Sequence, residues 1–134
     1  MTTRVFVPID SSALAVGAEA VAQAIAKEAH ARGLDVRIIR NGSRGMVWLE
    51  PLVEVETPQG RIGYGQVSAG DAPALFDAGF LQGGEHPARL GKVEDLDWMA
   101  RQQRLTFARC GVIDPLSLED YRAHGGFDGL ERAL

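Results

Sequence analysis

The chain has very little cysteine: Cys110 is the only one among its 134 residues. A single thiol excludes an internal disulfide and any metal cage built from several cysteines. No apolar run approaches the ~20 residues that a membrane-spanning helix needs, and the first residues lack the apolar stretch of a signal peptide. Lys and Arg number 14 against 18 Asp and Glu, which argues against non-specific nucleic-acid binding. We therefore expect a cytoplasmic protein with neither a membrane nor a nucleic-acid partner.

What is present predicts an α/β domain. The hydrophobic fraction of 46% is that of a globular protein, and the length suffices for one core plus an appendage. Residues 4–8 predict a strand, and the alanine-rich residues 13–31 predict a long helix that Asp10 or the serines after it can cap. Residues 34–39 predict a second strand. Strand, helix and strand make a βαβ unit, in which the strands are parallel.

A hairpin and a closing helix follow this unit. Residues 52–56 and 61–67 predict two antiparallel strands. Valines alternate with Glu54 and Glu56 in the first strand, so we expect both glutamates on a solvated face. Residues 71–80 predict a helix. The order βαβ-ββα is that of a thioredoxin-like fold.

Three segments follow from this pattern. Residues 1–81 form the thioredoxin-like domain, and the glycine-rich residues 82–93 read as a linker. Residues 94–134 form a helical and extended segment, which begins with a helix at 94–103. The last helix carries an apolar stripe that needs a surface to pack against. The stripe consists of Phe127, Leu130 and Leu134.

The C-terminal segment carries a resemblance to a known family. A Gln-x-Arg strand at 102–104, a Gly-x-Ile-Asp-Pro turn at 111–115 and a Tyr-x-x-x-Gly-Gly-aromatic helix at 121–134 follow one another. Together they resemble the lead-in to the flavin domain of NADH-oxidising flavoprotein subunits. These subunits occur in respiratory complex I, in NAD-linked hydrogenases and in molybdenum-containing NAD-dependent formate dehydrogenases.

The N-terminal domain resembles the two-iron ferredoxin domains of the same enzymes. Those domains bind the cluster through four cysteines, with the spacing Cys-x4-Cys after the first strand and Cys-x3-Cys before the hairpin. Soft thiolates are the ligands that such clusters need. The corresponding positions here are Pro8, Ala13, Ser43 and Val47, and none of them offers sulfur. The resemblance therefore implies a relative of a cluster-binding domain that has lost its cluster.

Taken together, the two halves most resemble the N-terminal part of the beta subunits of NAD-dependent formate dehydrogenases. This implies partners: a downstream flavin domain, a molybdenum-containing alpha subunit and a small cluster-bearing gamma subunit. The full-length subunit would hold FMN, NAD and a four-iron cluster, and the whole complex would convert formate and NAD to CO2 and NADH. The glycine-rich flavin loop and the cluster cysteines of the family are absent from these 134 residues. We therefore expect no catalytic, cofactor-binding or metal-ligating residue here, no activity of the fragment alone, and a role in docking and scaffolding.

Two residues near the former cluster loop are candidates for contact with a partner. Glycines flank Ser43 and Arg44, and we expect Arg44 to be exposed and available for docking. Trp48 follows at the edge of the former cluster site, where it either fills the vacated volume or faces a partner. The apolar stripe of the last helix completes the set of interface candidates.

Other reactive residue types have simpler interpretations. Cys110 is expected to be a small, inert packing residue, because no second cysteine or local histidine supports redox chemistry. His30, His86 and His124 show no metal-binding spacing and are expected to be solvated or locally bonded. Three alternatives stay open: a free-standing thioredoxin-like interaction module, the equivalent domain of a hydrogenase diaphorase subunit, and a small enzyme that uses Ser43, Arg44 and the histidines.

Overall fold

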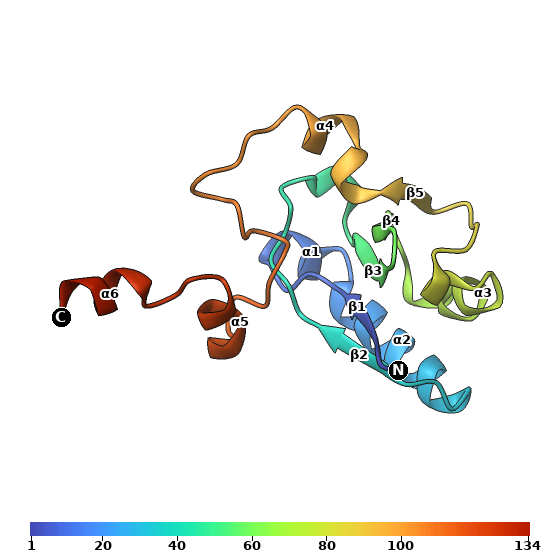
Figure 1. Cartoon of the computed structure of the whole chain (residues 1–134). Helices are drawn as coiled ribbons and strands as arrows, with labels where there is room; N and C mark the ends of the chain where they lie inside the picture. Colours follow the sequence, from blue (N-terminus) through green and yellow to red (C-terminus); the bar gives the residue numbers. More distant parts are fainter.

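The computed structural model describes all 134 residues and places a five-stranded mixed sheet at its centre (Figure 1). The strand order is β2-β1-β3-β4-β5. The strands are β1 (Thr3–Phe6), β2 (Val36–Ile39), β3 (Val53–Thr57), β4 (Gly60–Tyr64) and β5 (Arg89–Lys92). β1 and β2 are parallel, and all other pairs are antiparallel. The predicted βαβ unit and hairpin are both confirmed.

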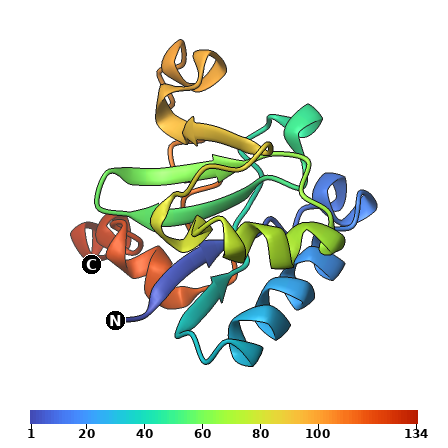
Figure 2. The same ribbon diagram turned by 90° about the vertical axis from the view of Figure 1, so that its right-hand side faces the viewer.

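Helices cover one face of this sheet. α1 (Ser11–Ala15), α2 (Ala18–Ala31) and α3 (Ala72–Asp77) follow β1 and β4, and Figure 2 shows α2 and α3 on the same side of the strands. The single helix predicted over residues 13–31 is wrong in one respect. Gly17 adopts a left-handed conformation with φ of 99°, which interrupts the helix and separates α1 from α2.

Two apolar clusters hold the domain together. The larger lies between the sheet and α2 and α3, and it includes an edge-to-face aromatic series in which Phe80 contacts both Tyr64 and Phe76. The smaller cluster lies on the opposite face of the hairpin and consists of Met46, Leu52, Val93 and Met99. This second cluster attaches the chain after β5 to the sheet.

The predicted linker contains a strand. β5 pairs with β4 through Gly63 opposite Gly91, and a Cβ at Gly63 would lie 2.8 Å from Val93 Cγ2. The close approach needs glycine, and glycine is also what made this segment look irregular in sequence. The helix predicted at 94–103 is likewise shorter: a 3-10 turn at Val93–Asp95 precedes α4 (Asp97–Ala100).

A C-terminal arm, residues 104–134, leaves the sheet. It contains α5 (Leu118–Ala123) and α6 (Asp128–Ala133), and the Oγ of Ser117 caps α5 by accepting the Asp120 N–H at 3.1 Å. Gly111 is its only buried residue, and α6 extends away from the sheet (Figure 1). None of the helices has the length and apolar character needed to cross a membrane.

Candidate functional site

The most unusual feature of the molecule is a buried ion cluster formed by Arg44, Glu54 and Arg61. Arg44 Nε and Nη2 donate to the two carboxylate oxygens of Glu54 at 2.8 and 2.7 Å. Arg61 Nη1 reaches the same carboxylate at 3.4 Å, and Arg44 also contacts Glu94 at 3.2 Å. Both Arg44 and Glu54 are buried. A bidentate arginine–carboxylate pair is among the strongest ionic contacts that a protein makes.

The three elements of the cluster come from the loop after β2, from β3 and from β4. Two sequence expectations are wrong here: Glu54 does not lie on a solvated face, and Arg44 is not exposed. The reason is that the loop folds over the sheet face that the helices leave open. The guanidinium of Arg44 then supplies the counter-charge that lets a glutamate be buried.

The two arginines respond differently to this environment. Burial acts to lower the pKa of Arg44, but hydrogen bonds and Coulombic attraction from Glu54 and Glu94 outweigh it, and the pKa is raised overall. Burial prevails at Arg61, whose pKa is lowered although Glu54 opposes the effect. Arg61 Cζ also lies 3.4 Å from the ring centroid of Phe6, which supports the guanidinium on one side. Arginine keeps its charge in proteins, so the cluster carries two cations against one buried anion.

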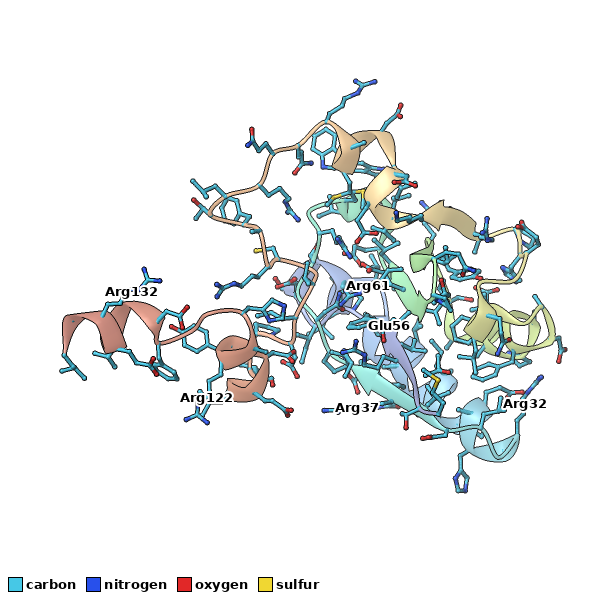
Figure 3. All side chains as sticks on the ribbon, viewed as in Figure 1. Arg32, Arg37, Glu56, Arg61, Arg122 and Arg132 are labelled. Atoms are coloured by element: carbon cyan, nitrogen blue, oxygen red, sulfur yellow. The ribbon has the colours of Figure 1, made fainter.

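The arm is anchored on this cluster, at the junction where Figure 3 places Arg61. The carbonyl oxygen of Gly111 accepts from Asn41 Nδ2 and from Arg61 Nη1, both at 2.8 Å. Arg61 Nη2 donates to the Val112 carbonyl oxygen. Arg104 Nη2 donates to the Arg44 carbonyl oxygen at 3.3 Å. Backbone carbonyls of the arm therefore satisfy the donors that Glu54 leaves free.

Gly111 fits this position for a steric reason. Its φ is 80°, a left-handed conformation that glycine adopts without cost. A Cβ at this residue would lie 2.4 Å from Arg44 Cγ. The glycine of the Gly-x-Ile-Asp-Pro turn is thus what lets the arm approach the buried arginine.

The positions that correspond to cluster cysteines form part of the surrounding polar network. Pro8 and Ala13 are buried at the end of β1 and in α1, whereas Val47 is exposed. Ser43 joins the two loops: its N–H donates to the Asp10 carboxylate, and its Oγ donates to Glu50 Oε1 at 2.9 Å.

Glu50 completes this network from the far end of the loop. Glu50 Oε2 accepts the Leu52 N–H at 2.8 Å. Burial raises the pKa of this carboxyl, against the two hydrogen bonds it accepts.

The donors at this place do not fit an iron–sulfur cluster. Cys110 is the only thiol of the chain, and no three His, Cys, Asp or Glu side chains converge on one point. Cys110 lines a shallow cavity of about 310 Å³ together with Asp10 and Ser43. It is exposed, so the expectation of a packed cysteine is wrong.

The interface candidates fall into two groups on the surface. Trp48 is half-exposed, so part of its side chain is accessible to a partner. The stripe of α6 is also exposed, although Phe127 stacks edge-on against Tyr121 with ring centroids 5.1 Å apart. These residues stay predicted contacts for a partner, whereas the guanidinium of Arg44 is occupied by Glu54 and Glu94.

The histidines lie apart from one another. His30 is exposed on α2, His86 Nδ1 accepts the Ala88 N–H at 3.1 Å, and His124 Nδ1 lies 2.8 Å from the Asp120 carbonyl oxygen. Ser43 and Arg44 are therefore not joined by a histidine, which removes the geometric basis for the small-enzyme alternative.

Sequence reasoning missed the ion cluster because its members come from a loop and two strands, and strand periodicity does not show that the loop covers this face of the sheet. The available clue was the cross-strand pattern of charge: Glu56 lies opposite Arg61 and forms an ion pair with Arg4. Glu54 lies two residues from Glu56 on β3 and therefore on the same face of the sheet. Its main counter-charge must come from a segment outside the strands that flank it.

Comparison with known proteins gives one clear result, which concerns the fold. No family model and no curated protein matches the chain. Among solved structures, the wild-type thioredoxin-like [2Fe-2S] ferredoxin from Aquifex aeolicus is similar with a TM-score of 0.57 and 20% identity, over 68% of this chain and 98% of the ferredoxin. A cysteine-to-serine variant of that ferredoxin gives a TM-score of 0.56 and 23% identity, over 67% and 99% of the two chains. The fold is thioredoxin-like, and the cluster cysteines are absent.

Proposed function

We propose that the chain is the docking and scaffold domain at the N-terminus of the NAD-reducing flavoprotein subunit of a formate dehydrogenase complex. In this proposal residues 1–81 and strand β5, which lies within the predicted linker 82–93, form the ferredoxin-type domain, and residues 94–134 lead into the flavin domain. The domain itself does no cofactor chemistry. FMN, NAD and a four-iron cluster belong to the rest of the subunit, and the molybdenum centre belongs to the alpha subunit.

The observation that carries the proposal is the anchoring of the arm. Its Gly-x-Ile-Asp-Pro turn, the motif that resembles the lead-in of the flavoproteins, is held by Asn41 and Arg61 through the carbonyls of Gly111 and Val112. Beyond that turn the arm buries no residue of its own. The arm is held to the domain at this turn, and its helices α5 and α6 are exposed. Such a segment is suited to position a further domain that packs against these helices.

The ferredoxin-like fold supports the same proposal in a second way. In the Aquifex ferredoxin this fold carries a [2Fe-2S] cluster, whereas this chain has one thiol. An ion cluster cannot accept an electron. A domain of this kind can therefore contribute position and contacts to a redox complex, but no relay centre.

The test is a deletion in the assembled complex. Removing residues 1–93 from the subunit should leave NADH oxidation with an artificial acceptor intact and abolish formate-dependent NAD reduction, because the flavin site survives and the alpha subunit is no longer positioned. Full formate-dependent activity of the deletion variant would contradict the proposal. So would iron or flavin bound stoichiometrically to residues 1–134.

Two alternatives make different predictions in the same system. A free-standing thioredoxin-like interaction module requires a coding sequence that ends at Leu134. The equivalent domain of a hydrogenase diaphorase subunit requires hydrogen, rather than formate, as the electron donor of the complex.

A further inference from the structure

Both tryptophans of the chain lie together on the surface. Trp48 and Trp98 are 50% and 51% exposed, and their rings meet edge-to-face with centroids 5.2 Å apart. Trp48 lies in the 3-10 turn Val47–Leu49, and Trp98 lies in α4. Tryptophan is usually mostly buried, and paired indoles left half in water mark a surface that contacts something else.

A cationic cavity adjoins the two indoles. It has a volume of about 420 Å³ and is lined by Trp98, Gln102 and Gly45 with three arginines, Arg44, Arg101 and Arg104. No carboxylate lines it. The cleft between the sheet and α5, by contrast, is lined by four carboxylates as well as three arginines. In a chain of net charge −4 this is a localised positive wall.

The charge of this wall is only partly neutralised within the chain. Arg44 is fully engaged with Glu54, and Arg104 donates to two backbone carbonyls, which leave its charge in place. Asp97 lies 3.6 Å from Arg101, but the two side chains are 92% and 81% exposed. Such an exposed pair contributes at most about 1 kcal/mol and yields readily to a better anion.

We propose that Trp48, Trp98, Arg101 and Arg104, together the tryptophan patch, form a docking surface for an acidic segment of a partner protein. Carboxylates of the segment pair with the two guanidinium groups, and an apolar side chain packs against the indoles. Tryptophan and arginine are the residue types that dominate binding energy at protein interfaces, and opposite charge across the contact supplies specificity.

A protein segment fits this surface better than a small molecule does. Small-ligand sites bury ~70–90% of their ligand, whereas the indoles and Arg101 all stay at least half exposed around a shallow cavity. The inference does not depend on which redox complex the chain belongs to. It rests only on the exposure and charge of the residues of the tryptophan patch.

The patch can be tested by its own fluorescence, because the chain has no tryptophan outside it. The probe is a Glu/Asp-rich peptide with two leucines and no aromatic residue, and its charge-reversed Lys/Arg counterpart is the control. We expect a saturable change of tryptophan emission with the acidic peptide that disappears at high salt. Arg101→Gln and Trp98→Ala should each weaken binding about tenfold, as the loss of one interface hot spot does.

Arg37→Gln is the matched control variant. Arg37 is an exposed arginine on β2 without an ion pair, and Figure 3 shows it far below α4. Its replacement should leave binding unchanged. Four results would each overturn the proposal: no saturable response up to about 1 mM peptide, an equal response to the charge-reversed peptide, wild-type affinity of Arg101→Gln, or competition by AMP or inorganic phosphate. The last result would assign the cavity to a small anion instead. Urea unfolding of the variants checks that each is folded.

Discussion

Replacing Glu54 by glutamine isolates the buried ion cluster as a source of stability. The substitution keeps the shape of the side chain but removes its charge. Arg44, whose side chain is 3% exposed, and Arg61, whose side chain is 14% exposed, then lose the only buried anion between them. Removing one partner of a buried ion pair costs about 3–5 kcal/mol, because the remaining charge is buried without compensation. This is a large part of the roughly 5–15 kcal/mol that stabilises a native domain.

The matched control is Glu56→Gln, two residues along the same strand. Glu56 pairs with Arg4, but the side chains of this pair are 39% and 50% exposed. An exposed pair contributes at most about 1 kcal/mol. The two variants change the same chemical group on the same strand and differ chiefly in burial.

Urea unfolding followed by circular dichroism measures the difference. With a slope of about 2 kcal/mol/M, Glu54→Gln should lower the midpoint by about 1.5–2.5 M and Glu56→Gln by less than about 0.5 M. The melting temperature of Glu54→Gln should fall by about 10–20 °C. Equal midpoints for the two variants would refute the reasoning, since burial would then make no difference.

Three further substitutions probe the anchor, the polar loop and the arm. Gly111→Ala should cost about 1–2 kcal/mol from the left-handed backbone alone, push the arm away from Arg44 and speed amide exchange across the anchor, whereas Gly129→Ala, with nothing within 4 Å of its Cβ, should leave the anchor unchanged. Burial raises the pKa of Glu50. The wild type should therefore gain stability relative to Glu50→Gln as the pH falls from neutral toward the ordinary glutamate pKa of about 4.3, and it should lose that gain as the pH rises again through the raised pKa. Urea midpoints of the two proteins that run parallel across this range would contradict the prediction. Ser117→Ala removes the cap of α5, and local exchange protection there should drop by about 0.5–2 kcal/mol while the urea midpoint of the domain stays constant.

The sequence predicted most of the sheet because the relevant information is local. The parallel pairing of residues around Val5 and Ile38 follows from a βαβ unit, and the hairpin follows from alternation around Val53 and Val55. Strand β5 escaped prediction because it pairs through backbone at Gly91, without an alternating pattern of side chains.

The ion cluster could not be predicted for a different reason. Whether Glu54 lies in water or in the interior depends on which segment covers that face of the sheet, and strand periodicity carries no information on this. The covering residues, Arg44 and Gly111, are 10 and 57 positions away in the chain. Local pattern assigns a side chain to a face, but only tertiary structure decides whether that face is wet.

The ion cluster can contribute both to the stability of the domain and to the position of the arm. The variants Glu54→Gln and Gly111→Ala separate these two contributions. Glu54→Gln leaves Arg61 and its bonds to the arm in place but removes the buried anion, so it weakens the sheet first. Gly111→Ala leaves every ion pair of the domain with its partners but pushes the arm off Arg44, so it loosens the arm first. If the cluster serves to hold the arm, then Gly111→Ala in a full subunit should reduce electron delivery to the flavin at a temperature where the domain itself is fully folded. If activity instead followed only the urea midpoints of the two variants, then the cluster would contribute stability alone and the anchor would have no role in positioning.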